Sequence, residues 1–166
     1  MSVQQGWVAL LAGRLTDTHP DLKLVNASIS GETTDGGLRR LPELLAAHKP
    51  TIVLVELGAN DGLRGYPIMN FRSNLHKIVA LSQAADAHVI LLQMEIPPNY
   101  GSRYTSAFHD SYSLIAESTD STLAPFLLDG IAGDPTLIQA DGLHPTIEAQ
   151  PLILDNVLPT LMELLD

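Results

Sequence analysis

The sequence contains no cysteine, few aromatic residues and no long hydrophobic run. Without cysteine there can be no disulfide, no thiolate nucleophile and no cysteine-based zinc site. Without an apolar run of about 18 to 20 residues, the sequence predicts no helix that spans a membrane. The chain has 166 residues, of which 45% are hydrophobic and 17% charged, a composition typical of a folded domain. We therefore expect one domain over residues 1–166.

Basic residues are also absent from the last part of the chain. All nine Lys and Arg lie in residues 1–103, residues 104–166 hold ten of the 19 Asp and Glu, and the net charge is −10. A negative surface disfavours nucleic acids and anionic membranes as partners. We interpret the acidic segment as a solvated surface that favours solubility. No basic start followed by an apolar stretch occurs, so no secretory signal is expected within the printed sequence.

Short apolar runs alternate with segments of helical periodicity. Strands are predicted at 23–29, 51–58 and 88–94, with 123–128 as a weaker fourth because Pro125 must sit at an edge or end. Helices are predicted at 4–16, 36–49, 67–86, 104–119 and 146–165, and Pro151 and Pro159 predict bends or breaks in the last one. This alternation predicts an α/β fold with a doubly wound parallel sheet. The chain begins on a helix, whereas such a sheet usually begins on a strand.

Asp141 and His144 form the sharpest local signal. A histidine that acts as a general base needs an acceptor at its other ring nitrogen, which sets its tautomer and orientation. An aspartate three residues earlier, on a tight loop bent at Gly142, can reach that nitrogen, and Pro145 is expected to begin the last helix. The alternative is an Asp–His pair that only caps the start of that helix.

Gly31 and Asn60 each follow a predicted strand, at the sheet edge where ligands of α/β proteins bind. Gly31 allows close approach to its backbone N–H, and Asn60 carries an amide donor, so the two could form an oxyanion hole. The alternative is that both are turn residues in the left-handed conformation. No HExxH or comparable spacing predicts a zinc site, and no Gly-x-Gly-x-x-Gly or P-loop pattern predicts a nucleotide site.

Four stretches resemble the SGNH (GDSL) hydrolase family, in particular its bacterial arylesterases and multifunctional acyl hydrolases with thioesterase and lysophospholipase activity. They are NASISGETT (26–34), VLVELGANDGLRG (53–65), PPNYGSRY (97–104) and DGLHP (141–145), in the family's order. The resemblance covers nearly the whole chain. It implies a flavodoxin-like three-layer α/β/α sandwich, a small-molecule ester or thioester substrate, and no metal or cofactor.

The resemblance also implies residue roles. Gly31 and Asn60 correspond to the family's oxyanion hole, and Asp141 and His144 to the acid and base of its Ser–His–Asp triad. The loops 63–67 and 97–104 are expected to shape the acyl pocket. The resemblance favours a periplasmic or secreted protein over a cytoplasmic one, although the sequence itself leaves both location and oligomeric state open.

The nucleophile is the departure from the family pattern. The family's serine stands in a Gly-Asp-Ser-Leu-Ser block after the first strand, and no such block occurs in this sequence. Ser28 and Ser30 match serines of the stretch around Gly31, so we assign no serine of this chain as the nucleophile. We expect that serine and its strand to lie upstream of Met1, which would leave this chain alone nearly inactive.

Two alternatives stay open. The chain could be a non-catalytic binding module that keeps the cleft of a hydrolase. Another polypeptide could instead supply the missing strand by β-augmentation.

Overall fold

The computed structural model describes residues 5–165, and within them the chain divides into two compact units. The central unit is Ala27–Ala124, and the terminal unit combines the residues up to Asn26 with those from Pro125 onward. Each unit is described by itself. In the described part of the chain, no helix is both long and apolar enough to cross a membrane.

The central unit is built on a parallel sheet of three strands. These are β1 (Ile52–Val55), β2 (His88–Leu92) and β3 (Thr122–Ala124), in the order β1-β2-β3. In the ladders, Val53 lies opposite Val89 and Leu91 lies opposite Leu123. The middle strand β2 is almost fully buried after His88, which explains its continuous run of apolar residues.

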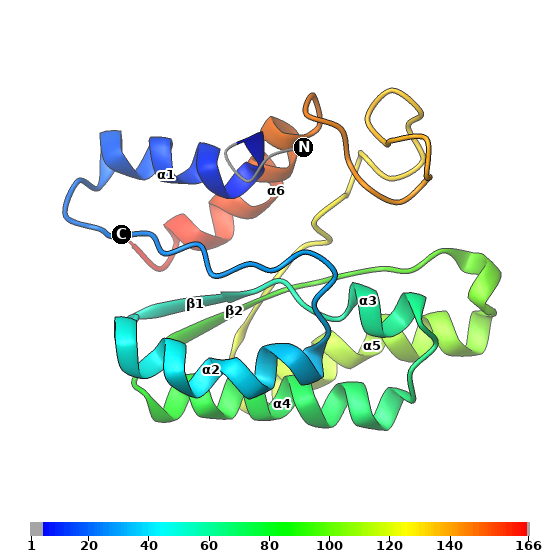
Figure 1. The fold of residues 1–166 in the computed structure, drawn as a ribbon, viewed down its shortest axis with the longest axis horizontal. Helices are drawn as coiled ribbons and strands as arrows, with labels where there is room; N and C mark the ends of the chain where they lie inside the picture. The colour runs from blue at the N-terminus through cyan, green and yellow to red at the C-terminus, as the bar shows by residue number, and fades with distance from the viewer. Residues whose placement is uncertain (1–4, 166) are drawn as a thin grey trace. The chain divides into compact units, whose positions relative to one another are not determined.

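Four helices complete the central unit: α2 (Thr34–His48), α3 (Ala59–Leu63), α4 (Ile68–Ala84) and α5 (Ser102–Thr119), with a 3-10 turn at η2 (Pro98–Tyr100). Helices α2, α4 and α5 lie on the same side of the sheet (Figure 1). Helix α4 packs against β2 and against both neighbouring helices, and α5 packs against β3. The arrangement is therefore a parallel sheet with helices on one face within this unit.

An aromatic cluster joins α4 and α5 beneath the sheet. The rings of Phe71 and Phe108 stack with centroids 4.9 Å apart, and Tyr112 meets both rings edge-on. All three side chains are buried, and the Tyr112 hydroxyl donates a 2.8 Å hydrogen bond to the carbonyl of Leu57. Because Leu57 lies two residues after the end of β1, this bond from α5 fixes the path of the chain as it leaves the strand towards Asn60.

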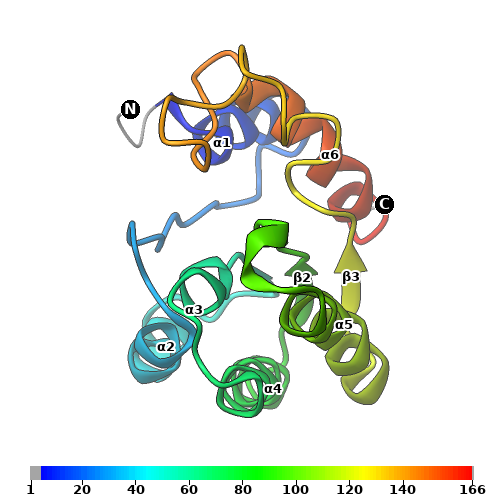
Figure 2. The same ribbon diagram turned by 90° about the vertical axis from the view of Figure 1, so that its right-hand side faces the viewer.

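The terminal unit consists mainly of two paired helices, α1 (Trp7–Thr18) and α6 (Gln150–Met162). They pack side by side (Figure 2), with buried apolar side chains at Leu11, Leu15, Ile153, Leu154, Val157 and Leu161. Gln150, only 2% exposed, accepts the first N–H of α1 from Trp7 at 2.9 Å. Since that N–H has no partner inside its own helix, Gln150 acts as the cap of α1.

Most predicted elements are confirmed, with bounds that differ by a few residues. The strands at 51–58 and 88–94 correspond to β1 and β2, and the weak strand at 123–128 becomes β3, which ends just before Pro125. The helices predicted at 4–16, 36–49, 67–86 and 104–119 correspond to α1, α2, α4 and α5. Pro125 ends the third strand as expected, because proline cannot donate to a ladder.

The predicted strand at 23–29 is wrong. This stretch carries no secondary structure, and Val25 and Ile29 are 41% and 56% exposed. A strand exists only through pairing with a neighbour, and no segment of the described chain forms a ladder with it. Its apolar, β-branched composition therefore has no sheet to join within residues 5–165.

The last helix also differs from its prediction. It begins at Gln150 rather than at 146, so Pro151 falls in the first turn, where its missing N–H costs nothing. The helix continues through Pro159 to Met162. The sequence analysis predicts no helix between 51–58 and 67–86, where the structure has the short helix α3 after the left-handed Gly58.

Candidate active site

Asp141 and His144 pair through their side chains in the terminal unit. The Oδ2 atom of Asp141 lies 2.7 Å from Nδ1 of His144. The Oδ1 atom of the same carboxylate accepts the backbone N–H groups of Leu143 at 2.9 Å and His144 at 3.0 Å. Gly142 makes the bend between them with φ +72°, a left-handed conformation that glycine adopts without strain. The predicted loop and its pairing are confirmed.

A short hairpin frames this loop. Ile138 and Pro145 form an antiparallel bridge, and the carbonyl of His144 accepts the Gln139 N–H at 2.7 Å. The Gln139 side chain also donates to the carbonyl of Pro145 at 2.9 Å. Pro145 therefore belongs to the hairpin and does not begin the last helix. The alternative of a helix-capping pair is wrong as well, because α6 begins only at Gln150, with Ala149 as its N-cap.

The environment of Asp141 favours its charged form. The backbone N–H of His144, then that of Leu143 and the His144 side chain, lower the pKa of Asp141 to about 2. An ionised carboxylate can only accept hydrogen bonds, so a neutral His144 must carry its proton on Nδ1, facing Asp141. That tautomer leaves Nε2 unprotonated and able to act as a base.

Gly31 lies in the central unit, on a turn closed by a hydrogen bond from the Glu32 N–H to the Ile29 carbonyl. Its φ of +76° is left-handed, as the turn alternative predicted. Within residues 5–165, its N–H has no hydrogen-bond acceptor. The turn therefore presents a backbone donor that is available to a ligand.

Asn60 is the second residue of α3, so the alternative that it is a left-handed turn residue is wrong. Its side-chain nitrogen donates to the carbonyl of Glu32 at 3.0 Å. The side chain thus reaches the residue next to Gly31, and the two predicted oxyanion donors belong to one neighbourhood. One amide hydrogen holds Asn60 to Glu32, and the second is left for another acceptor.

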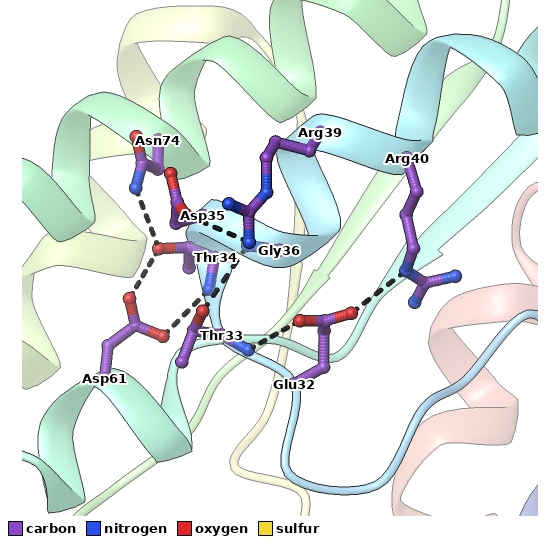
Figure 3. Close-up of polar contacts among 9 residues, drawn as sticks. All are labelled: Glu32, Thr33, Thr34, Asp35, Gly36, Arg39, Arg40, Asp61 and Asn74. Carbon is purple, nitrogen blue, oxygen red and sulfur yellow. Dashed lines mark hydrogen bonds and ion pairs between the residues drawn. The ribbon is translucent and has the colours of Figure 1, made fainter.

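The sequence interpretation missed the polar residues that surround this turn. The buried carboxylate of Asp61 accepts two hydrogen bonds from Thr34, and Arg40 pairs with Glu32 (Figure 3). The only sequence signals were their positions, directly after Asn60 and within the stretch around Gly31. Asp61 also contributes, after burial, to raising the pKa of Tyr112 well above its usual value.

The loops 63–67 and 97–104 contact each other within the central unit. The Tyr100 hydroxyl donates to the carbonyl of Leu63 at 2.9 Å, and the Tyr104 hydroxyl donates to that of Tyr66 at 2.7 Å. An open hollow of about 610 Å³ lies beside them, lined by Ile68, residues 100–104 and Ala107. The predicted site residues thus fall into separate groups, with Gly31 and Asn60 in the central unit and Asp141 and His144 in the terminal unit.

The chain is similar to known hydrolases over nearly its whole length. It is 49% identical over 165 residues to the esterase TesA of Pseudomonas aeruginosa, which covers 99% of this chain and 82% of that protein. It is 43% identical over 155 residues to thioesterase 1/protease 1/lysophospholipase L1 of Escherichia coli strain K12, with 93% of this chain and 73% of that protein covered.

Its structure also matches that of a solved esterase. The crystal structure of the psychrotrophic esterase EstA from Pseudoalteromonas sp., inhibited by monoethylphosphonate, superposes with a TM-score of 0.94 at 47% identity. The match covers 99% of this chain and 90% of that one. The family model of the GDSL-like lipases and acylhydrolases matches residues 2–150. The chain therefore belongs to the GDSL-like lipase/acylhydrolase family, the SGNH hydrolases, whose members act on ester bonds.

Proposed function

We propose that this chain supplies the acid, the base and the oxyanion hole of a Ser–His–Asp esterase or thioesterase. The observation that carries the proposal is the 2.7 Å contact between Asp141 Oδ2 and His144 Nδ1, which leaves Nε2 as the basic nitrogen. His144 takes the proton of the nucleophilic serine while the serine oxygen attacks the acyl carbonyl. The leaving alcohol or thiol then receives that proton from His144, and water hydrolyses the acyl-enzyme by the same two steps.

The oxyanion of the tetrahedral intermediate is held by the Gly31 N–H and the Asn60 amide. Their support is structural: the Gly31 N–H has no acceptor in residues 5–165, and Asn60 is anchored by one hydrogen so that the other can point at a ligand. Donors that are already oriented stabilise the developing charge without reorganising.

We further propose that the nucleophilic serine is not among the 166 residues. The support is the absence of any Gly-Asp-Ser sequence from the chain. Loss of one triad member costs on the order of 10⁴ to 10⁶ in rate. The chain alone should therefore be nearly inactive, and the protein translated from the full reading frame should be active if that frame encodes the block.

The experiment compares both proteins on p-nitrophenyl acetate and with a fluorophosphonate probe. We expect turnover and labelling only with the longer protein. In that protein, His144→Ala should lose roughly 10⁴-fold or more, whereas His109→Ala, a histidine exposed on α5, should keep activity. A full reading frame without a Gly-Asp-Ser block, or His144→Ala with unchanged turnover, would contradict the proposal.

The substrate class is a carboxylic ester or thioester of a small molecule, as in arylesterases, acyl thioesterases and lysophospholipases. The names of the Pseudomonas and Escherichia relatives support this range. We propose that the loops 63–67 and 97–104 shape the acyl pocket, and the hollow lined by residues 100–104 supports the second of these loops. Turnover of p-nitrophenyl esters and acyl-CoA thioesters of increasing chain length would define the preference. We also propose a periplasmic or secreted location, which cell fractionation would test.

A second candidate is a non-catalytic module that keeps the cleft, and the missing Gly-Asp-Ser block favours it. It predicts that neither protein hydrolyses esters or reacts with the fluorophosphonate, while the 166-residue chain folds and binds an acyl ligand. Size-exclusion chromatography adds a further test. An aggregated chain argues against an autonomous module and for a missing strand that another segment or polypeptide supplies.

A further inference from the structure

We infer that Asp61 is a positioning residue that, through Thr34, holds the turn of Gly31 in register with Asn60. The inference rests on the proposed oxyanion hole and names the group that sets its geometry. Asp61 follows Asn60 on α3, and Thr34 is the first residue of α2, directly after the turn. A link between Asp61 and Thr34 therefore joins the two segments that carry the proposed donors.

The link is short and buried. Asp61 is 2% exposed and Thr34 is fully buried. The carboxylate accepts the Thr34 backbone N–H at Oδ2, 2.9 Å away, and the Thr34 hydroxyl at Oδ1, 2.5 Å away (Figure 3). Two bonds to one residue fix both the distance and the rotation of the carboxylate, which a single bond would not.

A third helix orients the hydroxyl. The Asn74 side chain on α4 donates to Thr34 Oγ1 at 3.3 Å. Because that oxygen accepts from Asn74, its own hydrogen is directed to Asp61. Helices α2, α3 and α4 thus meet at one hydroxyl, and a buried network in which every member is paired specifies a single arrangement.

No Lys or Arg forms an ion pair with Asp61 in the described part of the chain. Its charge instead faces the first N–H groups of α2, where the helix dipole favours an anion. The partners of the carboxylate are thus the backbone and the hydroxyl of the residue that follows the turn, so the network bears directly on where that segment lies.

A second clamp holds the other side of the turn. Arg40 Nε lies 3.2 Å from Glu32 Oε2, and its Nη1 donates to the Ala27 carbonyl at 2.6 Å. The Glu32 carbonyl in turn accepts from Asn60. Arg40 thus bonds residues on both sides of the turn and Asp61 bonds Thr34 after it, so that loss of either contact should release Asn60 from Glu32.

The test uses NMR of the ¹⁵N-labelled 166-residue chain, with Thr34→Val, Thr34→Ser and Ser82→Ala variants. Thr34→Val removes the hydroxyl with little change of volume, and Thr34→Ser keeps it. Ser82→Ala is the matched control, because Ser82 is also fully buried in the central unit but bonds only the Ile78 carbonyl of its own helix. The signals to follow are the Gly31 amide and the two side-chain amide protons of Asn60.

We expect Thr34→Val to shift both signals and to speed hydrogen exchange at the Asn60 amide roughly tenfold or more. Thr34→Ser should restore the parent signals, and Ser82→Ala should leave them unchanged. Signals in Thr34→Val that match those of Ser82→Ala would overturn the inference. If Thr34→Val does not fold, Asn74→Ala carries the same test, because it removes only the donor to Thr34.

An activity measurement separates this inference from the proposed function. In the protein from the full reading frame, Thr34→Val should lower kcat roughly 10- to 100-fold with little change in KM, because misplaced donors affect the transition state more than binding. If the parent protein does not hydrolyse esters, the proposed function fails while the NMR result still decides the role of Asp61. If it hydrolyses and Thr34→Val leaves kcat unchanged, the positioning role is contradicted.

Discussion

The carboxylate of Asp141 bonds His144 twice, once through the imidazole Nδ1 at 2.7 Å and once through the backbone N–H at 3.0 Å. The bond from the backbone N–H holds the Asp141 carboxylate without the help of the imidazole. Since the backbone N–H holds the carboxylate in place, the acid is oriented before the histidine side chain takes part. This arrangement lets the loop retain its shape in variants that lack the imidazole.

The first prediction concerns the titration of Asp141. Its pKa of about 2 is lowered first by the His144 backbone N–H and then by that of Leu143, with the imidazole contributing less. His144→Ala should therefore leave the pKa of Asp141 well below its usual 3.8, as measured from the side-chain carboxyl ¹³C shift. Thr136→Val is the matched control, because the Thr136 hydroxyl is the main cause of the lowered pKa of Asp134.

The pH dependence of the loop follows from the sign of this shift. A depressed carboxyl pKa stabilises the folded loop above the usual value of 3.8, and this contribution is lost as the pH falls towards 2. The step that Asp141 protonation causes in the Leu143 and His144 amide signals should therefore lie below about pH 3. Movement of these signals centred near pH 4 would contradict the prediction.

The second prediction concerns the bend at Gly142. With φ at +72°, Gly142→Ala should destabilise the folded state by about 1 to 2 kcal/mol and displace His144 from Asp141. Gly13→Ala is the matched control, because Gly13 lies inside α1 with no atom within 4 Å of the added methyl. That change should stabilise the helix by roughly 0.5 to 1 kcal/mol. Urea denaturation of both variants measures the difference, and equal effects would show that the bend imposes no strain.

The third prediction compares two adjacent arginines on α2. Arg40 is 28% exposed and bonds both Glu32 and the Ala27 carbonyl, whereas Arg39 is 76% exposed and contacts only Asp35 among the described residues (Figure 3). Arg40→Ala should cost about 1 to 2 kcal/mol of unfolding free energy, and Arg39→Ala less than about 0.5 kcal/mol. Chemical denaturation measures both. Similar costs for the two changes would mean that the clamp on the turn contributes nothing.

The fourth prediction concerns Tyr112. Burial, and then the charge of Asp61, raises its pKa well above 10.0, so the folded state keeps its phenolic proton while the unfolded state loses it. Stability should therefore be unaffected by this group below pH 10 and should fall as the pH rises above it. The part of the absorbance change at 295 nm that belongs to Tyr112, obtained by subtracting the titration of a Tyr112→Phe variant, should appear only on unfolding.

Tyr112→Phe provides the control for this measurement. The variant should lose about 1 kcal/mol at neutral pH, because the Leu57 carbonyl loses its donor. Its stability should no longer depend on pH through this group. Ionisation of Tyr112 in the folded parent protein near pH 10 would contradict the assignment.

The sequence predicted the elements whose signal is local. The runs around β1 and β2 were identified because a central strand is apolar on both faces, and α4 because its apolar stripe repeats at helical spacing. The stretch 23–29 also carries apolar and β-branched residues, but it forms no strand within residues 5–165. Composition indicates only that a segment can form a strand. Whether it does depends on a neighbouring strand to which its backbone can hydrogen-bond.

The same distinction applies to the candidate site. Asp141 and His144 could be paired from sequence, because a three-residue spacing on a bent loop brings the two side chains within reach of each other. The bond between Thr34 and Asp61 joins residues 27 positions apart, and that between Asn60 and Glu32 joins residues 28 apart. Neither spacing carries a periodic signal, because both contacts depend on how three helices pack.

The sequence by itself therefore indicated the family, the main strands and helices of the central unit, and the pairing of Asp141 with His144. The tertiary structure alone decided that Asn60 lies on a short helix against the turn of Gly31, and that a buried Asp61 holds this turn through Thr34. The physical reason is the separation along the chain over which each effect acts. Periodicity and turn chemistry act over a few residues, whereas the orientation of a hydrogen-bond donor is set by packing between segments that are distant in the chain.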